Sequence, residues 1–463
     1  MKVAIIGTGF SGVAAACQLL ARLPAGSELY LFNASGSMAR GLAYGTQSDE
    51  HQLNVPAARM SLYPQDPGHF QRWLQTQSLA GDGHEFVSRR LYGVYLQASL
   101  QAAQAEHPGV TVHSVVAAVQ ELETQSSGAE RLRYTCADGS SATLDVDAVV
   151  LALGHFAPRA ALPALQQLPA GLYINDPWQA SALDELDAEA PVALIGSGLT
   201  MLDMLLSLRR RGHRGPLLAL SRRGLQPLGH RANELPPPNW QLDHALTREA
   251  QTLRQMTRLF RAELRRAAAL GRDWRDVLGA FRAHTASCWS RLDLSDRARF
   301  LRHLQALWDV HRHRAAPSAI AVLEAARASG QLCAVAGRLQ LVELLDGGRA
   351  RLSWRPRGGG EARSFEAARI LNCSGPTAGS ASGFAAERSP LLAALQQQGR
   401  LQPCPLGLGL HTDAGLRLLD AQGRPQAGLF YLGPLLKAQH WEATAVPELR
   451  VFAERLAQAC TAP

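Results

Sequence analysis

The chain has 463 residues, of which 46% are hydrophobic and 19% are charged, and its formal net charge is +8. These values predict a globular protein of two or three domains. No apolar run reaches about 18 residues, so we expect no transmembrane helix and no membrane partner. An apolar strand that begins at Val3 argues against a signal peptide. The seven cysteines are scattered without a C-x-x-C pair, which is typical of buried cytoplasmic thiols and argues against a disulfide reductase.

Nearly all of the positive charge is arginine, because lysine occurs only at Lys2 and Lys437. So few lysines make a Schiff-base mechanism a poor candidate. Anion recognition must then rely on guanidinium groups, whose planar donors suit phosphate and carboxylate. A charge of this size on a chain of this length does not by itself indicate nucleic-acid binding.

The first twelve residues predict a dinucleotide-binding turn. The apolar run at 3–6 is typical of a buried parallel strand, and a helical pattern begins at Val13. The turn between them carries the G-x-G-x-x-G spacing at Gly7, Gly9 and Gly12. In this context the three glycines permit a tight turn, close approach of a pyrophosphate and close packing of helix on strand. The helix N-terminus would then face the phosphates with free N–H groups.

The next strand and the segment after it supply candidate cofactor contacts. Residues 28–32 are predicted to form the second strand, and Asn33 stands where this fold usually carries an acidic residue for a ribose hydroxyl. The stretch 40–61 has no clear period, and long irregular segments in compact domains are usually functional. We expect four of its side chains to line the cofactor, with a purely structural excursion as the alternative: Arg40, Asn54, Arg59 and Met60.

A helical pattern begins at Arg89, and Arg90 in its first turn could meet phosphates; a solvated arginine is the alternative. A strand is then predicted over 110–119. A hairpin over 132–146 follows, and a buried strand over 148–153 ends at Gly154. This order of strand, hairpin and strand is common in flavoproteins.

A second, partial fingerprint follows a buried strand at 191–195. The third glycine is missing, but the strand, the turn and a helical pattern come in the required order. The residues of this turn that we expect to contact a nucleotide are Gly196, Ser197, Gly198 and Thr200. Two nucleotide folds in one chain indicate two nucleotides, FAD and a nicotinamide cofactor.

The strand after the second turn, at 217–220, ends close to Arg222 and Arg223. This is where a dinucleotide fold meets the adenosine ribose, and arginines there favour a 2′-phosphate, hence NADPH over NADH. Seven arginines and no acid lie between Arg209 and Arg231. A solvated basic face is the alternative interpretation.

Residues 232–330 change character and predict an inserted helical block. A linker is marked by Pro236–Pro238. Helical patterns follow over 242–270, 273–284, 295–311 and 317–329. In the sequence WDVHRHR, His311 and His313 are two residues apart and do not share a helix face, so we expect no metal site. We interpret this stretch as a solvated helix end, with contact to an acidic ligand as the alternative.

Several motifs together resemble the FAD/NAD(P)-binding family of bacterial oxidoreductases over nearly the whole chain. Besides the two glycine turns, these motifs are RGLAYG at 40–45, LNVPAARMS at 53–61, RRLYGVYL at 89–96, SRRGL at 221–225 and WEATAVPELR at 441–450. That family is related to flavoproteins with two dinucleotide domains, including N-hydroxylating and Baeyer–Villiger monooxygenases. The resemblance implies an α/β fold with two Rossmann-like domains, for FAD and NADP, and a helical insertion.

The resemblance also implies that both chain ends build the FAD-binding domain around an inserted NADP-binding domain. The expected boundaries are 1–170 and 366–463 for the FAD domain, 171–231 and 331–365 for the NADP domain, and 232–330 for the insertion. Further residues assigned to the flavin site are Ser11, Val119, Gly154 and Gly433. His440 and Trp441 are the candidates for catalytic residues near the isoalloxazine ring.

The leading hypothesis is a cytoplasmic FAD-dependent oxidoreductase that uses NADPH. It would be a monooxygenase that takes dioxygen and oxygenates a small organic substrate through a flavin hydroperoxide. The alternative is a flavin-dependent NADPH reductase or dehydrogenase without oxygen insertion. A flavin-dependent nucleic-acid modifier is disfavoured because the arginine-rich stretch coincides with the predicted NADP pocket and lacks a stripe of stacking aromatics. A second nucleotide fold argues against a non-catalytic flavin-binding protein.

Overall fold

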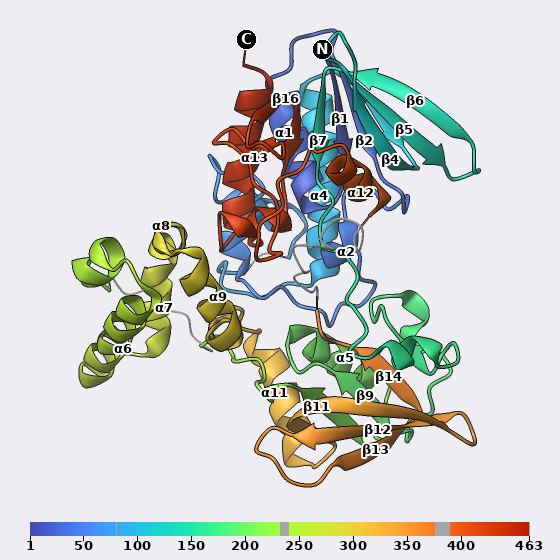
Figure 1. The fold of residues 1–463 in the computed structure, drawn as a ribbon, viewed down its shortest axis with the longest axis vertical. Helices are drawn as coiled ribbons and strands as arrows, with labels where there is room; N and C mark the ends of the chain where they lie inside the picture. Colours follow the sequence, from blue (N-terminus) through green and yellow to red (C-terminus); the bar gives the residue numbers. More distant parts are fainter. Residues whose placement is uncertain (80, 232–239, 376–388, 463) are drawn as a thin grey trace.

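The computed structural model describes residues 1–79, 81–231, 240–375 and 389–462, so the linker expected at Pro236–Pro238 lies outside the described residues. The chain forms two α/β domains, one above the other in Figure 1, and a group of helices that projects to one side. Both chain ends lie at the top of the first domain. The sheets of the two domains confirm the expected α/β class.

The first domain is built on a six-stranded sheet that takes strands from both chain ends, in the order β15-β16-β7-β1-β2-β3. All strand pairs are parallel except that of β15 with β16. The strands are β1 (Lys2–Ile6), β2 (Glu28–Phe32), β3 (Thr111–Val115), β7 (Ala148–Leu151), β15 (Arg417–Leu419) and β16 (Pro425–Tyr431). The central strands β1 and β7 are apolar and buried, as expected for a parallel sheet covered on both faces.

Helix α1 (Phe10–Leu20) packs between α4 (Arg89–Glu106) and α13 (Val446–Cys460). Every residue of α1 is buried, so the helix at the first glycine turn is held rigidly inside the domain. The shorter helical elements of this domain are α2 (Gly41–Tyr44), η1 (Ala57–Arg59), α3 (His69–Thr76), α12 (Pro390–Gln397) and η6 (Pro434–Ala438). The short helix η2 (Pro163–Gln167) instead packs in the core of the second domain.

A separate three-stranded antiparallel sheet joins β3 to β7. It consists of β4 (Ala117–Thr124), β5 (Glu130–Cys136) and β6 (Ser141–Val146). The single strand predicted over 110–119 is therefore wrong. The chain leaves the parallel sheet at exposed Val116 and enters the antiparallel sheet, and residue-by-residue apolar patterns carry no signal for such a change of partner.

The second domain repeats this plan in a seven-stranded sheet of order β13-β12-β11-β10-β9-β14-β8. Its strands are β8 (Tyr173–Ile174), β9 (Val192–Ile195), β10 (Leu217–Ser221), β11 (Leu332–Leu345), β12 (Arg349–Pro356), β13 (Arg363–Ala367) and β14 (Arg369–Asn372). Helix α5 (Leu199–Arg210) follows β9, and the short 3-10 helix η3 (Ala180–Leu183) precedes β9. The sheet is parallel from β11 to β8, and β12 and β13 extend it as an antiparallel edge.

The pairing of β14 corrects the expected domain boundary at residue 366. β14 lies between β9 and β8, so residues 369–372 belong to the second domain. The buried Arg369 supports this placement, because its guanidinium donates to the carbonyl oxygens of Ala182 and Asp184 at 2.7 and 3.1 Å.

The helical insertion leaves and rejoins the second domain at adjacent points. The His230 N–H donates to the Ala315 carbonyl at 3.0 Å, and the Ala315 N–H donates to the Leu228 carbonyl at 2.9 Å. Between them lie η4 (Ala245–Glu249), α6 (Leu253–Ala269), α7 (Trp274–Phe281), η5 (Arg282–His284), α8 (Thr285–Arg291), α9 (Leu294–His303) and α10 (Gln305–Arg312). Helix α11 (Pro317–Ala328) packs on α5 in the core of the second domain, so the insertion ends before the expected residue 330.

All seven cysteines are free, and five are buried. Cys136 is half-buried and Cys333 is exposed, so the expectation that all the thiols are buried is wrong for these two. Within the described parts of the chain, no helix is long and apolar enough to cross a membrane. The same residues contain no cluster of three histidine, cysteine or acidic side chains that could hold a metal ion.

Candidate functional site

The two glycine turns are seated in the same way in the two domains. Gly7 has a φ of 101°, and a Cβ atom there would lie 2.3 Å from the carbonyl oxygen of Ala152, just after β7. Gly196 has a φ of 119°, and a Cβ atom there would lie 2.3 Å from the carbonyl oxygen of Cys373, just after β14. Each turn is thus pressed onto the end of a neighbouring strand, at a φ that favours glycine and without room for a side chain.

Both helix N-termini that follow these turns are unoccupied by side chains. Gly9 caps α1 and Gly198 caps α5, and neither helix has a capping side chain or an acidic residue in its first turn. The free N–H groups and the positive end of each helix suit a diphosphate. A Cβ atom on Gly198 would meet nothing within 4 Å, so a ligand can approach there, and Thr200 lies in the same turn. The residues present therefore fit two dinucleotides.

Further residues predicted for the flavin site meet at the carboxyl edge of the first sheet. Gly12 lets α1 pack on the turn, because a Cβ atom there would lie 2.0 Å from the Gly7 carbonyl oxygen. A Cβ atom on Gly433, after β16, would lie 3.7 Å from Ser11 Oγ. Gly154, three residues beyond β7, has a φ of 66° and open space around it. Three segments distant in sequence thus converge on one edge, where open α/β sheets bind ligands.

Asn33 organises its own turn. Its Nδ2 donates to Thr8 Oγ1 at 2.5 Å and to the Ser37 carbonyl at 3.1 Å, and its Oδ1 accepts from the N–H and Oγ of Ser35. The side chain ties the end of β2 to Thr8 of the glycine turn. A carboxylate at this position could not donate to the Ser37 carbonyl, which explains why asparagine suits the turn.

The segment 40–45 lies against the first glycine turn. A Cβ atom on Gly41 would lie 2.8 Å from the Gly9 Cα, so the two backbones are in close contact. Arg40 is half-buried and donates to Gln97 Oε1 at 3.3 Å. Arg59, in contrast, is exposed in η1. Arg40 is therefore near the predicted diphosphate site, and a cofactor contact for either arginine stays a prediction.

Asn54, Met60 and Val119 have structural contacts of their own. The Asn54 carbonyl accepts from His230 Nε2 at 3.0 Å, which links the first domain to the second. Met60 is buried and its carbonyl accepts from Tyr92 Oη at 2.8 Å. Val119 is half-buried in β4 and packs on the core of the first domain. Each backbone is fixed by these contacts, and the assignment of these residues to flavin contact stays a prediction.

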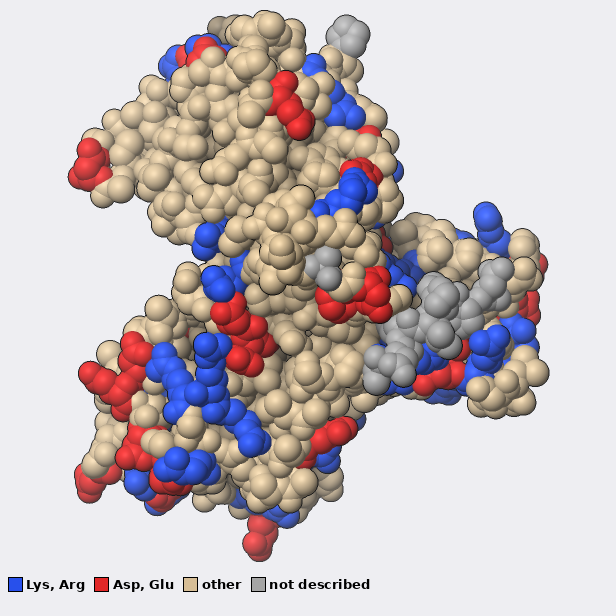
Figure 2. Space-filling view, turned by 180° about the vertical axis from the view of Figure 1, so that it is seen from behind, with Lys and Arg blue, Asp and Glu red and all other residues tan. Residues whose placement is uncertain are grey.

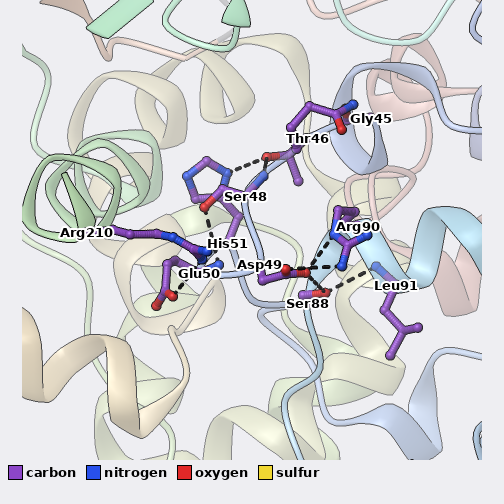
Figure 3. Close-up of polar contacts among 11 residues, drawn as sticks. Gly45, Thr46, Ser48, Asp49, Glu50, His51, Ser88, Arg90, Leu91 and Arg210 are labelled. Carbon is purple, nitrogen blue, oxygen red and sulfur yellow. Dashed lines mark hydrogen bonds and ion pairs between the residues drawn. The ribbon is translucent and has the colours of Figure 1, made fainter. Parts of the chain in front are cut away.

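Arg90 is engaged at the surface. Figure 3 shows its guanidinium directed at the carboxylate of Asp49, with donor distances of 2.7 and 3.1 Å, beside Ser88, which caps α4. The same loop continues to Glu50, which pairs with Arg210 of α5 at 3.1 Å. Arg90 is thus held by an acid of its own domain, and its assignment to phosphate binding stays a prediction.

The neighbouring Arg89 contacts the second domain instead. It donates to both carboxylate oxygens of Asp203 on α5, at 2.9 and 2.8 Å. Buried His51 approaches the same helix, with its Nε2 2.8 Å from Ser207 Oγ, and burial lowers its pKa. These contacts fix the two glycine turns relative to each other.

The two arginines predicted to bind a 2′-phosphate have different environments. Arg222 is exposed, whereas Arg223 donates to the carbonyl oxygens of Arg302 and His303 at the end of α9. Ser197 Oγ donates to the Leu225 carbonyl at 2.5 Å, which anchors the turn to the chain after β10. Arg222 therefore remains the candidate phosphate ligand, and Arg223 holds the insertion.

Basic and acidic side chains are interspersed on the face of the molecule in Figure 2. Several of the arginines between 209 and 231, for which a solvated basic face was the alternative interpretation, are paired with acids from other segments. Arg211 pairs with Asp184, and Arg214 with Glu189. This mixture of signs differs from the basic stripe typical of nucleic-acid binding.

His440 and Trp441 lie in different environments although they are adjacent. The His440 ring packs 4.8 Å from the Phe452 ring of α13, and burial lowers its pKa. Trp441 is 3% exposed and turns toward the insertion, where its ring lies 4.6 Å from that of Trp289. Trp441 also lines an apolar cavity of about 460 Å³ within the insertion.

The stretch at 308–314 is half-buried and contacts the first domain, so its interpretation as a solvated helix end is wrong. Arg312 is 12% exposed and contacts the Glu442 carboxylate at 2.7 Å. Arg282 likewise donates to both oxygens of Glu448 at 2.7 Å. The acids that neutralise these arginines lie more than 100 residues further along the chain, which is why their pairing could not be predicted.

A group of titratable side chains lies where the insertion meets the carboxyl edge of the first sheet. Burial lowers the pKa of Lys437, while Asp309 and Glu442 oppose this change. Lys437 acts electrostatically on His155, which is exposed, and burial with nearby cations lowers the pKa of His313 to about 3. Sequence reasoning missed Lys437 and His155. Their signals were the rarity of lysine and the positions just after Gly433 and Gly154.

Residues 4–156 match a family model described as FAD-NAD(P)-binding, so this part of the chain is an FAD-NAD(P)-binding domain and the recognition from sequence is confirmed for it. No curated protein matches the chain.

Solved structures share the fold over nearly the whole chain. Ornithine hydroxylase of Pseudomonas aeruginosa is 15% identical, with a TM-score of 0.63, over 99% of this chain and 98% of that one. An ornithine N-hydroxylase of Kutzneria sp. 744, with reduced FAD, NADP+ and L-ornithine, is 11% identical, and L-lysine 6-monooxygenase of Pseudomonas syringae is 16% identical. Both have a TM-score of 0.64 with the same coverage. At these identities the likeness establishes the fold of a two-dinucleotide flavoprotein.

Proposed function

We propose that the chain is an FAD-dependent oxidoreductase that uses NADPH and acts as a monooxygenase on a small molecule. The observation that carries the proposal is that both glycine turns pack closely against the end of a neighbouring strand, Gly7 against Ala152 and Gly196 against Cys373. Each turn leads into an uncapped helix N-terminus that suits a diphosphate. The matches to flavin monooxygenases of similar length support the same assignment.

The first domain would hold FAD and the second NADPH. Bound FAD supplies hydride acceptance from NADPH and, once reduced, reaction with dioxygen. The chain's own residues bind and orient: Gly9 and Gly198 open the two diphosphate sites, and Arg222 is the candidate partner of the 2′-phosphate. Lys437 and His155, at the carboxyl edge of the first sheet, can hold or move protons beside the predicted flavin position.

The purified protein tests the proposal directly. It should be yellow, and NADPH should bleach it without oxygen. A colourless protein that takes up no FAD would contradict the assignment. NADPH consumption that requires oxygen supports the monooxygenase. Consumption that is unchanged when oxygen is replaced by an organic acceptor would identify a reductase instead.

A further inference from the structure

The insertion encloses a cavity of about 460 Å³, which is within the range of small-molecule sites. Its walls come from α6, α7, α8, α9 and α10, the helices that project beside the first domain in Figure 1. One wall residue, Trp441, comes from the first domain itself. The cavity is therefore lined by both the insertion and the C-terminal segment of the chain.

Aromatic rings dominate the walls. Four of the eight tryptophans of the chain line the cavity: Trp274, Trp289, Trp308 and Trp441. Several polar groups of the lining residues are bonded to backbone carbonyls, whereas Trp308 Nε1 is buried with no hydrogen-bond partner among the described residues. Thr257 Oγ1 donates to the Leu253 carbonyl at 2.7 Å, and His311 Nδ1 donates to the Leu307 carbonyl at 2.7 Å. A molecule inside the cavity would therefore meet mostly apolar surface.

The charge of the cavity lining is positive. Arg261, exposed on α6, lines the cavity, and none of its described lining residues is aspartate or glutamate. An ammonium group in this space would lose its hydration without gaining a carboxylate partner, which is costly. A basic amine or a diamino acid is therefore a poor occupant, in contrast to the ornithine and lysine named for the proteins of similar fold.

The cavity adjoins the predicted flavin edge through Trp441. The Lys437 ammonium lies 4.0 Å from the centre of the Trp441 ring, on the segment that follows Gly433. Lys437 also acts electrostatically on His155, which directly follows Gly154 at the carboxyl edge of the first sheet. One indole ring and one lysine thus stand between the cavity and that edge.

We propose that this cavity is the substrate site, and that the substrate is an apolar aliphatic or aromatic molecule without an ammonium group. A carboxylate or hydroxyl at one end would be accepted beside Arg261. Identifying the bound molecule as a substrate rests on the proposed function. Its binding to the cavity can be measured without any reaction.

Four probes measured on the FAD-loaded protein test the chemical class: decan-1-ol, decanoate, decylamine and L-ornithine. Calorimetry should detect binding of the alcohol and the carboxylate, and both should change the intrinsic tryptophan fluorescence. Decylamine should bind at least about tenfold more weakly, since its chain is matched and only the head group differs. Equal or tighter binding of decylamine or L-ornithine, or no binding of decan-1-ol, would overturn the proposal.

Two variants on one helix test the location. Leu264→Trp on α6 fills the cavity and should weaken decan-1-ol binding at least about tenfold, as read by calorimetry. Leu270→Trp adds the same ring at the 66% exposed end of that helix and should leave binding unchanged. If Leu264→Trp does not fold, Thr257→Phe serves the same purpose. Unchanged affinity in a folded filling variant would exclude this cavity as the site.

The two proposals can fail separately. Decan-1-ol binding by a protein that does not oxidise NADPH would retain the cavity as an apolar ligand site and remove its role in the proposed function. NADPH oxidation that L-ornithine stimulates, with no binding of decan-1-ol, would overturn the cavity proposal and leave the oxidoreductase in place.

Discussion

The Arg89 guanidinium donates to both carboxylate oxygens of Asp203, across the boundary between the two dinucleotide domains. Arg89 begins α4 of the first domain, and Asp203 lies on α5, which begins at the second glycine turn. Their side chains are only 17% and 7% exposed. The relative position of the two predicted nucleotide sites thus depends on a largely buried ion pair.

Replacing Arg89 with Met should destabilise the protein by about 3 kcal/mol, because it leaves the Asp203 carboxylate buried without its partner. Arg90→Met is the matched control in the same helical turn. It breaks an exposed pair with Asp49 and should cost at most about 1 kcal/mol. Urea unfolding of both variants measures the difference, and equal losses would show that the interdomain pair has no special weight.

Gly7→Ala should abolish FAD retention, because its Cβ atom would overlap the Ala152 carbonyl oxygen. Gly26→Ala is the control: Gly26 also has a positive φ, 84°, but nothing lies within 4 Å of the added atom. That variant should keep its FAD and lose only about 1 kcal/mol of stability. The flavin content of the purified variants gives the answer. Full FAD content in Gly7→Ala would contradict the account that FAD binding depends on close packing of the first glycine turn against Ala152.

Arg222→Ala should reduce the preference for NADPH over NADH about tenfold, through a higher KM for NADPH, because a charge-assisted contact with the 2′-phosphate is lost. Arg223→Ala should instead loosen the end of α9, since Arg223 donates to carbonyl oxygens there. Its effect should appear in thermal stability more than in coenzyme preference. An unchanged NADPH preference in Arg222→Ala would remove the assignment.

The stability of the protein should fall as the pH is lowered from about 6.5 toward 4. His313 has a pKa of about 3 in the folded chain, against 6.5 for the free side chain, chiefly because of burial. Within this pH range the unfolded chain binds protons that the folded chain does not, so lowering the pH favours unfolding.

His313→Gln should flatten this pH dependence, whereas His84→Gln, at an exposed position, should leave it unchanged. Urea unfolding of the two variants and the parent protein at about pH 7 and about pH 5 makes the comparison. An equal loss of stability between the two pH values in all three proteins would show that other groups control the stability at acid pH.

Local signals in the sequence were sufficient for the elements near each glycine turn. The apolar run before Gly7, the glycine spacing and the helix after it depend on neighbouring residues. The structure has the strand, the turn and the helix in the predicted order, although the helix begins at Phe10 and not at Val13. The second turn at Gly196 has the same order even though its third glycine is absent.

Contacts between distant segments could not be predicted in this way. The pairing of β14 with β9, which moves the domain boundary beyond residue 366, is a property of the folded sheet. Arg312 finds Glu442 130 residues along the chain, so its burial left no local pattern. Asn33 was predicted to stand in for an acidic ribose ligand, but its donation to Thr8 of the glycine turn and to the Ser37 carbonyl could not be predicted.

The most direct test of the account is to mix the FAD-loaded protein with NADPH or NADH without oxygen and to follow the absorbance of the oxidised flavin. We predict that NADPH bleaches the flavin faster than NADH, and that admitting oxygen restores the absorbance. A protein that retains no FAD, or whose bound FAD is not reduced by NADPH, would contradict the assignment of the two nucleotide domains.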